Sequence, residues 1–200
     1  MMKRLSIIVA SFLLLSSTSV FAEGLSFGIL ANNRVVGTHV GLLTSSPYGA
    51  LEVAGSLIYN KDRYTIGSGL VSVQSDNLSP GLRYGLGFKY VNGTMKSKDK
   101  NHRGDLSAVG FNLGGAYELP ATINPFSIPI EVTLNGTLAP KSITFDETNG
   151  YMDFTAGLRF YMLENAYLAL THSYIEAEFD TGSTWTRYVN ETALGVVLTF

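Results

Sequence analysis

The sequence contains no cysteine and little charge. Without cysteine, its 200 residues can form neither a disulfide framework nor a thiolate metal site. Charged residues make up 15% of the chain and hydrophobic residues 46%, whereas soluble domains average roughly 25% charged residues. This balance excludes intrinsic disorder, which requires low hydrophobicity and high charge. The net charge of −2 argues against a nucleic-acid partner, because nucleic-acid-binding proteins carry a basic field.

Long apolar runs of transmembrane-helix length are also missing. Residues 1–22 instead have the three parts of a secretory signal peptide, with Lys3 and Arg4 before a short apolar stretch and Ala22 at the expected cleavage site. The apolar stretch is too short for a membrane anchor, which needs about 20 residues. We therefore expect a signal peptide at 1–22 and one exported domain at 23–200.

The mature chain alternates apolar residues with small or polar ones, which is the period of a β-strand. In 82–91, LRYGLGFKYV, every second residue is Leu, Tyr or Phe. Ten strands are predicted, at 24–31, 35–44, 50–59, 64–74, 82–92, 106–119, 128–138, 150–162, 166–178 and 187–200. An eight-stranded alternative applies if the segments within 24–44 pair poorly. Turn-like connections at 45–49, 75–81, 120–127 and 163–165 alternate with longer polar ones at 92–105, 139–149 and 179–187, as in an up-and-down meander.

The composition of the two strand faces favours a membrane barrel over a soluble one. The less apolar face is mostly Gly, Ala, Thr, Ser and Asn, which suits a crowded lumen better than a solvated surface. Aromatic residues also gather near the strand ends, as in the two girdles of such barrels. One group is Tyr59, Tyr64, Tyr90, Tyr151, Tyr174 and Tyr188, and the opposite group is Phe27, Tyr48, Tyr84, Tyr117, Tyr161, Tyr167 and Phe200.

The chain ends on alternating apolar residues and a terminal aromatic, namely Leu194, Val196, Leu198 and Phe200. This ending resembles the C-terminal assembly signal of bacterial outer-membrane barrels, which implies the assembly machinery as a partner during biogenesis. The fold class is therefore expected to be all-β: an up-and-down antiparallel transmembrane β-barrel of about ten strands. It would lie in the outer membrane of a Gram-negative bacterium.

Charged residues on the lumen-facing positions carry both signs. The candidate lumen charges are Glu52, Arg83, Lys89, Glu118, Glu131, Asp153, Arg159 and Glu191. Unpaired buried charges are costly, so we expect these groups to pair and close the lumen. The alternative is a small pore whose selectivity they tune. A barrel of about ten strands encloses little more than its side chains, which favours the closed lumen.

Two polar segments are candidates for surface contacts. The connection at 92–105 holds Lys96, Lys98, Lys100 and Arg103, which could contact phosphates of lipopolysaccharide, although a solvated loop is the simpler interpretation. The tip at 180–187 holds the single tryptophan, Trp185, interpreted as an interfacial anchor.

Catalytic and cofactor motifs are missing from the sequence. His39, His102 and His172 show no ligand spacing, so no metal site or cofactor is predicted. The sharpest catalytic candidate is His172 beside Ser173, because some outer-membrane barrels hydrolyse lipids. Neighbouring side chains on a strand point to opposite faces, so these two cannot form a dyad. We expect no catalytic residues.

Several short runs resemble the YfaZ family of bacterial outer-membrane proteins: EGLSFGI, GFNLGGAYELP, NGTLAPKSITF, YMDFTAGLRF and LTHSYIEAEF. The resemblance covers most of the mature chain. In 168–175 the family tends to show a Gly-Tyr-Arg-Tyr run, where this chain has His172 and Ser173 and so loses an arginine. The resemblance implies an outer-membrane barrel with no established activity.

The leading functional hypothesis is a small monomeric outer-membrane barrel with a structural or surface-interaction role and a largely closed lumen. Its partners would be outer-membrane lipids and lipopolysaccharide. A narrow pore for small solutes is the alternative, and a lipid-modifying hydrolase is a third hypothesis.

Overall fold

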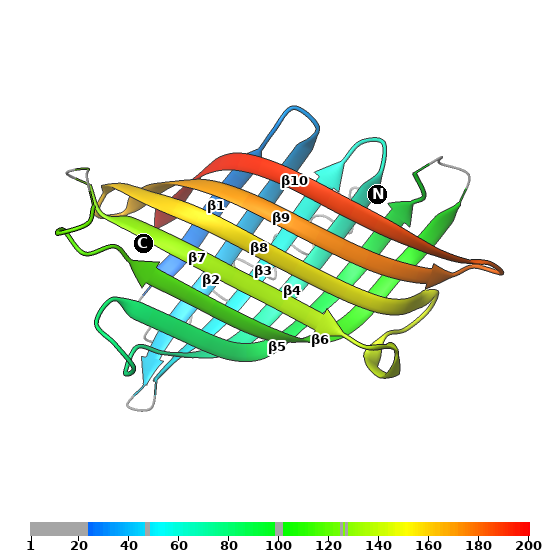
Figure 1. Ribbon diagram of the computed structural model, residues 1–200, viewed down its shortest axis with the longest axis horizontal. Helices are drawn as coiled ribbons and strands as arrows, with labels where there is room; N and C mark the ends of the chain where they lie inside the picture. The colour runs from blue at the N-terminus through cyan, green and yellow to red at the C-terminus, as the bar shows by residue number, and fades with distance from the viewer. Residues whose placement is uncertain (1–23, 47–48, 99–101, 125, 127) are drawn as a thin grey trace, which may run out of the picture.

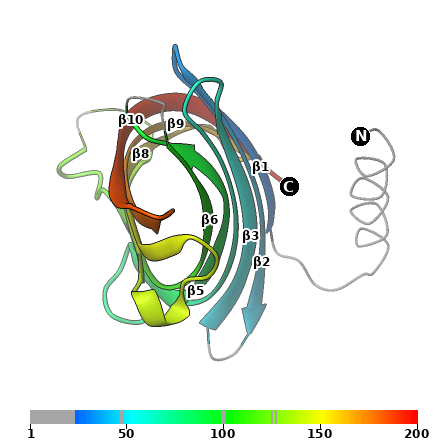
Figure 2. The ribbon, with the colours of Figure 1, turned by 90° about the vertical axis from the view of Figure 1, so that its right-hand side faces the viewer.

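The chain forms a closed ring of ten antiparallel strands in which each strand pairs with its neighbours in sequence and β1 pairs with β10. The computed structural model describes residues 24–46, 49–98, 102–124, 126 and 128–200. Figures 1 and 2 show the ring from the side and after a quarter turn. The predicted fold class is confirmed, with ten strands rather than eight. The expected signal peptide lies outside the described residues.

The strands match the predicted ones closely, and several are longer. Their bounds are β1 Gly24–Ala31, β2 Val35–Ser46, β3 Gly49–Asn60, β4 Tyr64–Ser75, β5 Leu82–Lys96, β6 Arg103–Glu118, β7 Ile130–Ala139, β8 Thr148–Leu163, β9 Ala166–Asp180 and β10 Thr184–Thr199. A single-turn 3₁₀ helix, η1, spans Lys141–Ile143. No described helix is long and apolar enough to cross a membrane.

The two ends of the barrel differ in what they carry. At the terminal end, β1 begins beside the last residue of the chain, and the backbones of Leu25 and Phe200 exchange hydrogen bonds of 3.0 and 2.8 Å. At the opposite end, which we call the loop end, lie the β1–β2, β3–β4, β5–β6, β7–β8 and β9–β10 connections. The prediction of long loops at 92–105 and 179–187 is wrong, because β5, β6, β9 and β10 continue through most of these segments.

Large apolar side chains project outward from all ten strands. This apolar belt includes Phe27, Val36, Leu57, Val73, Leu86, Leu113, Leu134, Phe154, Leu170 and Leu194, one exposed residue from each strand in chain order. The facing positions inside the ring are small or polar, as Gly85 and Gly87 are beside Leu86. The arrangement of apolar residues outside and polar residues inside is the inverse of a soluble barrel.

Toward the loop end the same strands reverse this arrangement. On β5, Val91 and Met95 turn inward and are fully buried, while Asn92 and Lys96 turn outward. We call the resulting inward cluster the apolar plug; it contains Val91, Met95, Leu106, Ala177, Phe179 and Val189, with Trp185 packed against it. The plug is a core of the soluble type inside one end of the barrel.

The plug corrects two interpretations of aromatic residues. Trp185 is not an interfacial anchor: its ring stacks on Phe179 at a centroid distance of 4.5 Å, and its indole nitrogen donates to the Thr181 hydroxyl at 3.0 Å. Tyr64 and Tyr151 are buried inside the ring rather than forming part of an outer girdle. The strands that extend beyond the belt bury these aromatic residues in their own core.

Candidate functional site

The charged side chains of the lumen centre on Glu131 of β7. This carboxylate accepts a hydrogen bond from the Arg159 guanidinium of β8 at 2.7 Å and a second, ion-paired contact from Arg83 of β5. The Arg159 guanidinium also lies over the Tyr167 ring, 5.2 Å from its centroid. Register brings these groups together, because Glu131 pairs directly with Arg159 across β7 and β8. One acid therefore ties two cations into the wall.

A second ion pair lies nearer the plug. Lys89 of β5 donates to the Asp153 carboxylate of β8 at 2.8 Å, across the lumen. The same carboxylate accepts hydrogen bonds from the Tyr151 hydroxyl at 2.7 Å and the Thr137 hydroxyl at 3.1 Å. Asn112 continues this network by donating to Thr137 at 3.0 Å. Every oxygen of Asp153 is thus satisfied inside the ring, as a buried carboxylate requires.

The cations of these pairs reach further into the lumen than the acids. The side chains of Arg83, Arg159 and Lys89 are 42, 35 and 20% exposed, whereas those of Glu131 and Asp153 are 5 and 4% exposed. The carboxylates are recessed into the wall and the cations stand in front of them. The surface presented to water in this part of the lumen is therefore basic, although the paired charges balance.

The other predicted lumen charges lie in three different settings. Glu52 faces inward and accepts hydrogen bonds from Gln74 at 2.6 Å and Ser72 at 3.0 Å, so neutral donors hold it in place of a cation. Glu191 faces inward and accepts from the Asn32 amide at 3.3 Å. Glu118 is the last residue of β6 and is exposed at the mouth of the terminal end.

The sequence reasoning missed one inward cation, Arg187 of β10. Its residue is 5% exposed, and its Nε has no hydrogen-bond partner among the described residues. It was missed because 180–187 was expected to be a tip, whereas β10 begins at Thr184. Its alternation with Val189 and Glu191 is the signal that places it inside.

The lumen is accessible toward the terminal end and filled by side chains toward the loop end. Between the Lys89–Asp153 pair and the plug lies a cavity of only about 40 Å³, bordered by Ser56, Ser68 and Ser173. Beyond it, the side chains of Met95 and Leu106 are completely buried. The exposed guanidiniums of Arg83 and Arg159 mark the accessible half. The lumen is therefore a vestibule that ends at the apolar plug.

The predicted surface and assembly residues lie on the outside. Lys96 ends β5, Arg103 begins β6 and Lys98 lies between the strands; all three are exposed. Lys100 lies outside the described residues. Leu194, Val196, Leu198 and Phe200 of the candidate assembly signal are exposed on the outer face beside β1.

The structure places the two residues of the catalytic candidate on opposite faces of β9. His172 faces outward, with its Nδ1 2.9 Å from the Thr192 hydroxyl, while Ser173 faces inward, 3.1 Å from the Thr155 hydroxyl. The expected separation of His172 from Ser173 is thus observed. No group of three or more potential metal-ligating side chains occurs in the part of the chain that the structure describes.

Comparison with known proteins yields structural likeness only. No protein-family model and no curated protein matches the chain. One similar solved structure is a KdgM porin in complex with disordered oligogalacturonate, with 11% identity, a TM-score of 0.40, and coverage of 88% of this chain and 99% of that chain. A second KdgM porin structure has 10% identity, a TM-score of 0.41 and coverage of 88 and 99%. A NanC porin structure has 10% identity, a TM-score of 0.41 and coverage of 88 and 98%.

Proposed function

We propose that the protein is a small β-barrel of the bacterial outer membrane. The observation that carries this proposal is the apolar belt: exposed Leu, Val and Phe side chains surround the ring on all ten strands. In water a belt of this kind would be an aggregation surface, because soluble monomers rarely expose patches beyond a few hundred Å². In hydrocarbon it is the expected exterior, and the closed ladder satisfies the backbone groups internally.

The sequence supports the same location. An N-terminal signal peptide at 1–22 would export the chain, and the ending at Leu194–Phe200 would direct its insertion by the outer-membrane assembly machinery. Both features belong to the proposal, as does membership of the YfaZ family. With both termini on the periplasmic side, the loop end would face the cell exterior.

The lumen favours a structural or surface-interaction role over free passage of solutes. Phe179, Met95 and Leu106 fill the ring near the loop end and are completely buried, so side chains occupy the lumen at this level. A monomeric barrel that is closed in this way displays its loop end and its outer wall, and it keeps the membrane sealed.

A narrow pore for small solutes is the second candidate, and one observation in this chain favours it. The vestibule between the terminal end and the plug presents three partly exposed cations, Arg83, Lys89 and Arg159. A purely structural wall has no need of water-exposed charge inside. In this candidate the plug would open, and the solutes would be small anions.

Conductance across a planar bilayer separates the two candidates. A closed barrel is expected to give no steady current, and Phe179→Ala together with Trp185→Ala should open a current by emptying the plug. A steady current from the wild-type protein that changes with Glu131→Gln would overturn the closed-lumen proposal and support the pore.

The location has its own test. A membrane barrel should show heat-modifiable migration in gel electrophoresis and leave the membrane fraction only with detergent. Extraction by salt alone would refute the outer-membrane proposal.

A further inference from the structure

We propose that the outer wall of β3–β5 binds a phosphorylated lipid of the outer leaflet, the lipid anchor of lipopolysaccharide. An acyl chain would lie in a groove on this wall, and the phosphate would lie beneath cations at the loop end. The inference rests on the proposed membrane location and adds a binding site to it. Three features of the wall support it: the groove, the order of residues above it, and the distribution of charge around the rim.

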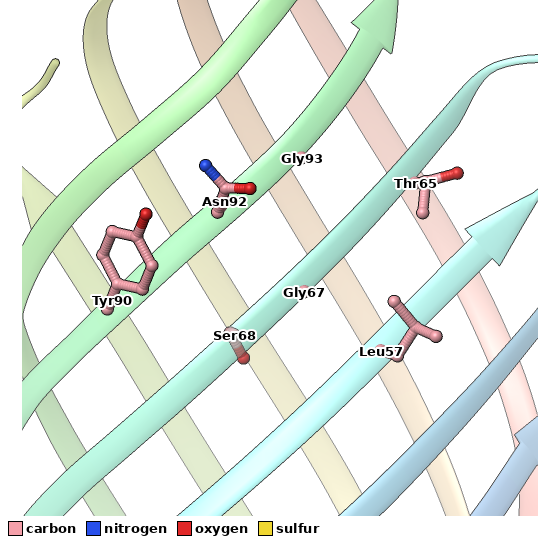
Figure 3. Close-up of a pocket in the computed structure, with 7 residues that line it drawn as sticks. All are labelled: Leu57, Thr65, Gly67, Ser68, Tyr90, Asn92 and Gly93. Atoms are coloured by element: carbon pink, nitrogen blue, oxygen red, sulfur yellow. The ribbon is translucent and has the colours of Figure 1, made fainter. Parts of the chain in front are cut away.

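The groove has a volume of about 420 Å³ and is lined by Leu57, Thr65, Gly67, Ser68, Tyr90, Asn92 and Gly93. In Figure 3, Leu57 of β3 and Tyr90 of β5 stand on either side of β4, where Gly67 lies between them. Strand pairing sets this geometry, because Gly67 pairs with Leu57 on one side and with Asn92 on the other. The missing side chain of Gly67 leaves the depression between two large neighbours.

The backbone does not require glycine at this position. A Cβ built on Gly67 would have its nearest neighbours at 3.7 Å, the Asn92 carbonyl oxygen, and at 4.0 Å, the Leu57 side chain and the Ser56 carbonyl oxygen. These are ordinary van der Waals distances, unlike those at Gly93, where a Cβ would meet the Thr65 carbonyl oxygen. The space over Gly67 is therefore free volume on the outer wall and can accept an alkyl chain.

Above the groove, three adjacent strands pass from apolar to polar to cationic residues in step. The order on β5 is Tyr90, Asn92, Thr94 and Lys96. On β4 it is Gly67 and Thr65, and on β3 it is Leu57 and Tyr59, with Arg63 and Lys61 above them in the β3–β4 turn. The Lys96 amide donates to the Arg63 carbonyl at 2.8 Å, which brings two of these cations side by side. Each two-residue step is about 6.6 Å along a strand, so the cations begin one or two steps above the groove.

The order of these residues matches the chemistry of a membrane lipid. An acyl chain ends in ester and sugar groups that accept hydrogen bonds, and then in phosphate. Asn92 and Thr94 supply donors at the middle level, while Lys61, Arg63 and Lys96 supply positive charge at the top. Three acidic side chains lie in or beside this group: Asp62, Asp105 of β6, which pairs with Thr94, and Glu147, whose carboxylate accepts from the Asp105 amide at 2.8 Å. Arg103 of β6, which pairs with Lys96, adds a fourth cation, so the group remains net positive.

The opposite side of the rim carries the other sign. Glu176, Glu178 and Asp180 follow one another along the outer phase of β9, which lies five strands from β4 in the ring. An anionic headgroup would be repelled there and attracted to β3–β5. This charge complementarity selects a phosphorylated lipid over a zwitterionic one and fixes the wall that it occupies.

The test is lipid binding by the folded full-length mature chain in detergent micelles, measured by native mass spectrometry. Diphosphorylated lipid A is compared with its dephosphorylated form. Near a charged surface each Lys or Arg contributes about fivefold in affinity. Arg63→Gln should therefore weaken binding of the phosphorylated form about fivefold, and removal of Lys61, Arg63 and Lys96 together should weaken it on the order of a hundredfold. Lys141→Gln on η1 is the matched charge control and should leave binding unchanged.

The groove is tested by a matched pair of glycine substitutions. Gly67→Leu should fill the groove and weaken binding of both lipid forms, while Gly136→Leu on the outer face of β7 should have no effect; there a Cβ would have its nearest neighbours at 3.8 Å. Equal affinity for the two lipids, or equal loss in target and control variants, would overturn the inference. Heat-modifiable migration of the same samples tests the membrane barrel separately: a chain that inserts into vesicles without preferring phosphate refutes only the lipid site.

Discussion

Replacement of Glu131 by glutamine should destabilise the barrel, because this one carboxylate anchors two cations. The Glu131 carboxylate is 5% exposed and holds both Arg83 and Arg159. Hydrogen bonds to charged groups contribute about 1.5–3 kcal/mol each. The two guanidiniums are 42 and 35% exposed, so water screens part of the stabilisation that these two ion pairs contribute. The glutamine amide also keeps one neutral hydrogen bond, which leaves an expected loss of about 2 kcal/mol in the free energy of unfolding.

The assay is urea unfolding in phospholipid vesicles, followed by tryptophan fluorescence. Trp185 is the single tryptophan and stacks on Phe179, so its emission reports whether the plug is intact. Glu52→Gln is the matched control, because neutral donors hold that carboxylate; its expected cost is about 1 kcal/mol. A double-mutant cycle with Arg159→Gln should give a coupling of about 1 kcal/mol. A change below about 0.5 kcal/mol for Glu131→Gln, or a coupling of zero, would refute the ion-pair reasoning.

Three further predictions follow from the packing and the chain end. Gly104→Ala should destabilise the plug by about 1–3 kcal/mol, because its Cβ would overlap the Phe179 ring, and Trp185 emission should shift. Gly93→Ala should lower the urea midpoint strongly because the new atom meets backbone, whereas Gly69→Ala, with nothing within 4 Å, should leave it unchanged or raise it. Phe200→Ala should reduce the amount of barrel recovered in the outer-membrane fraction, measured by heat-modifiable migration, while the purified chain still refolds in detergent.

The alternation of residue types predicts most of the barrel wall. It predicts all ten strands and the inward orientation of Arg83, Glu131 and Arg159. A period of two assigns each residue to one face of the sheet, whether that sheet faces water or lipid. It also separates His172 from Ser173. A closed ring follows from the same pattern, since an apolar outer face leaves no other way to satisfy the backbone.

The loop end is harder to predict, because alternation does not show where a strand leaves its membrane-type segment. Beyond Tyr90 the large apolar side chains of β5 point into the barrel instead of outward, so Val91 and Met95 are core residues. A polar stretch such as 92–105 then resembles a loop although it is largely strand. Trp185 and Arg187 were assigned to a tip for this reason. The ion-pair partners also depend on the strand register, which the sequence pattern leaves open.

Apolar side chains point outward in the belt and inward in the plug, so the two halves of the barrel are stabilised by different driving forces. The plug is shielded from water, so its assembly is driven by the hydrophobic effect and carries a large heat-capacity change. In the proposed membrane, the belt would exchange one apolar environment for another and would draw its stability from the backbone ladders instead. Because hydrophobic stabilisation weakens on cooling, we expect the loop end to be the cold-sensitive half of the barrel. Its plug should loosen at temperatures at which the belt remains intact.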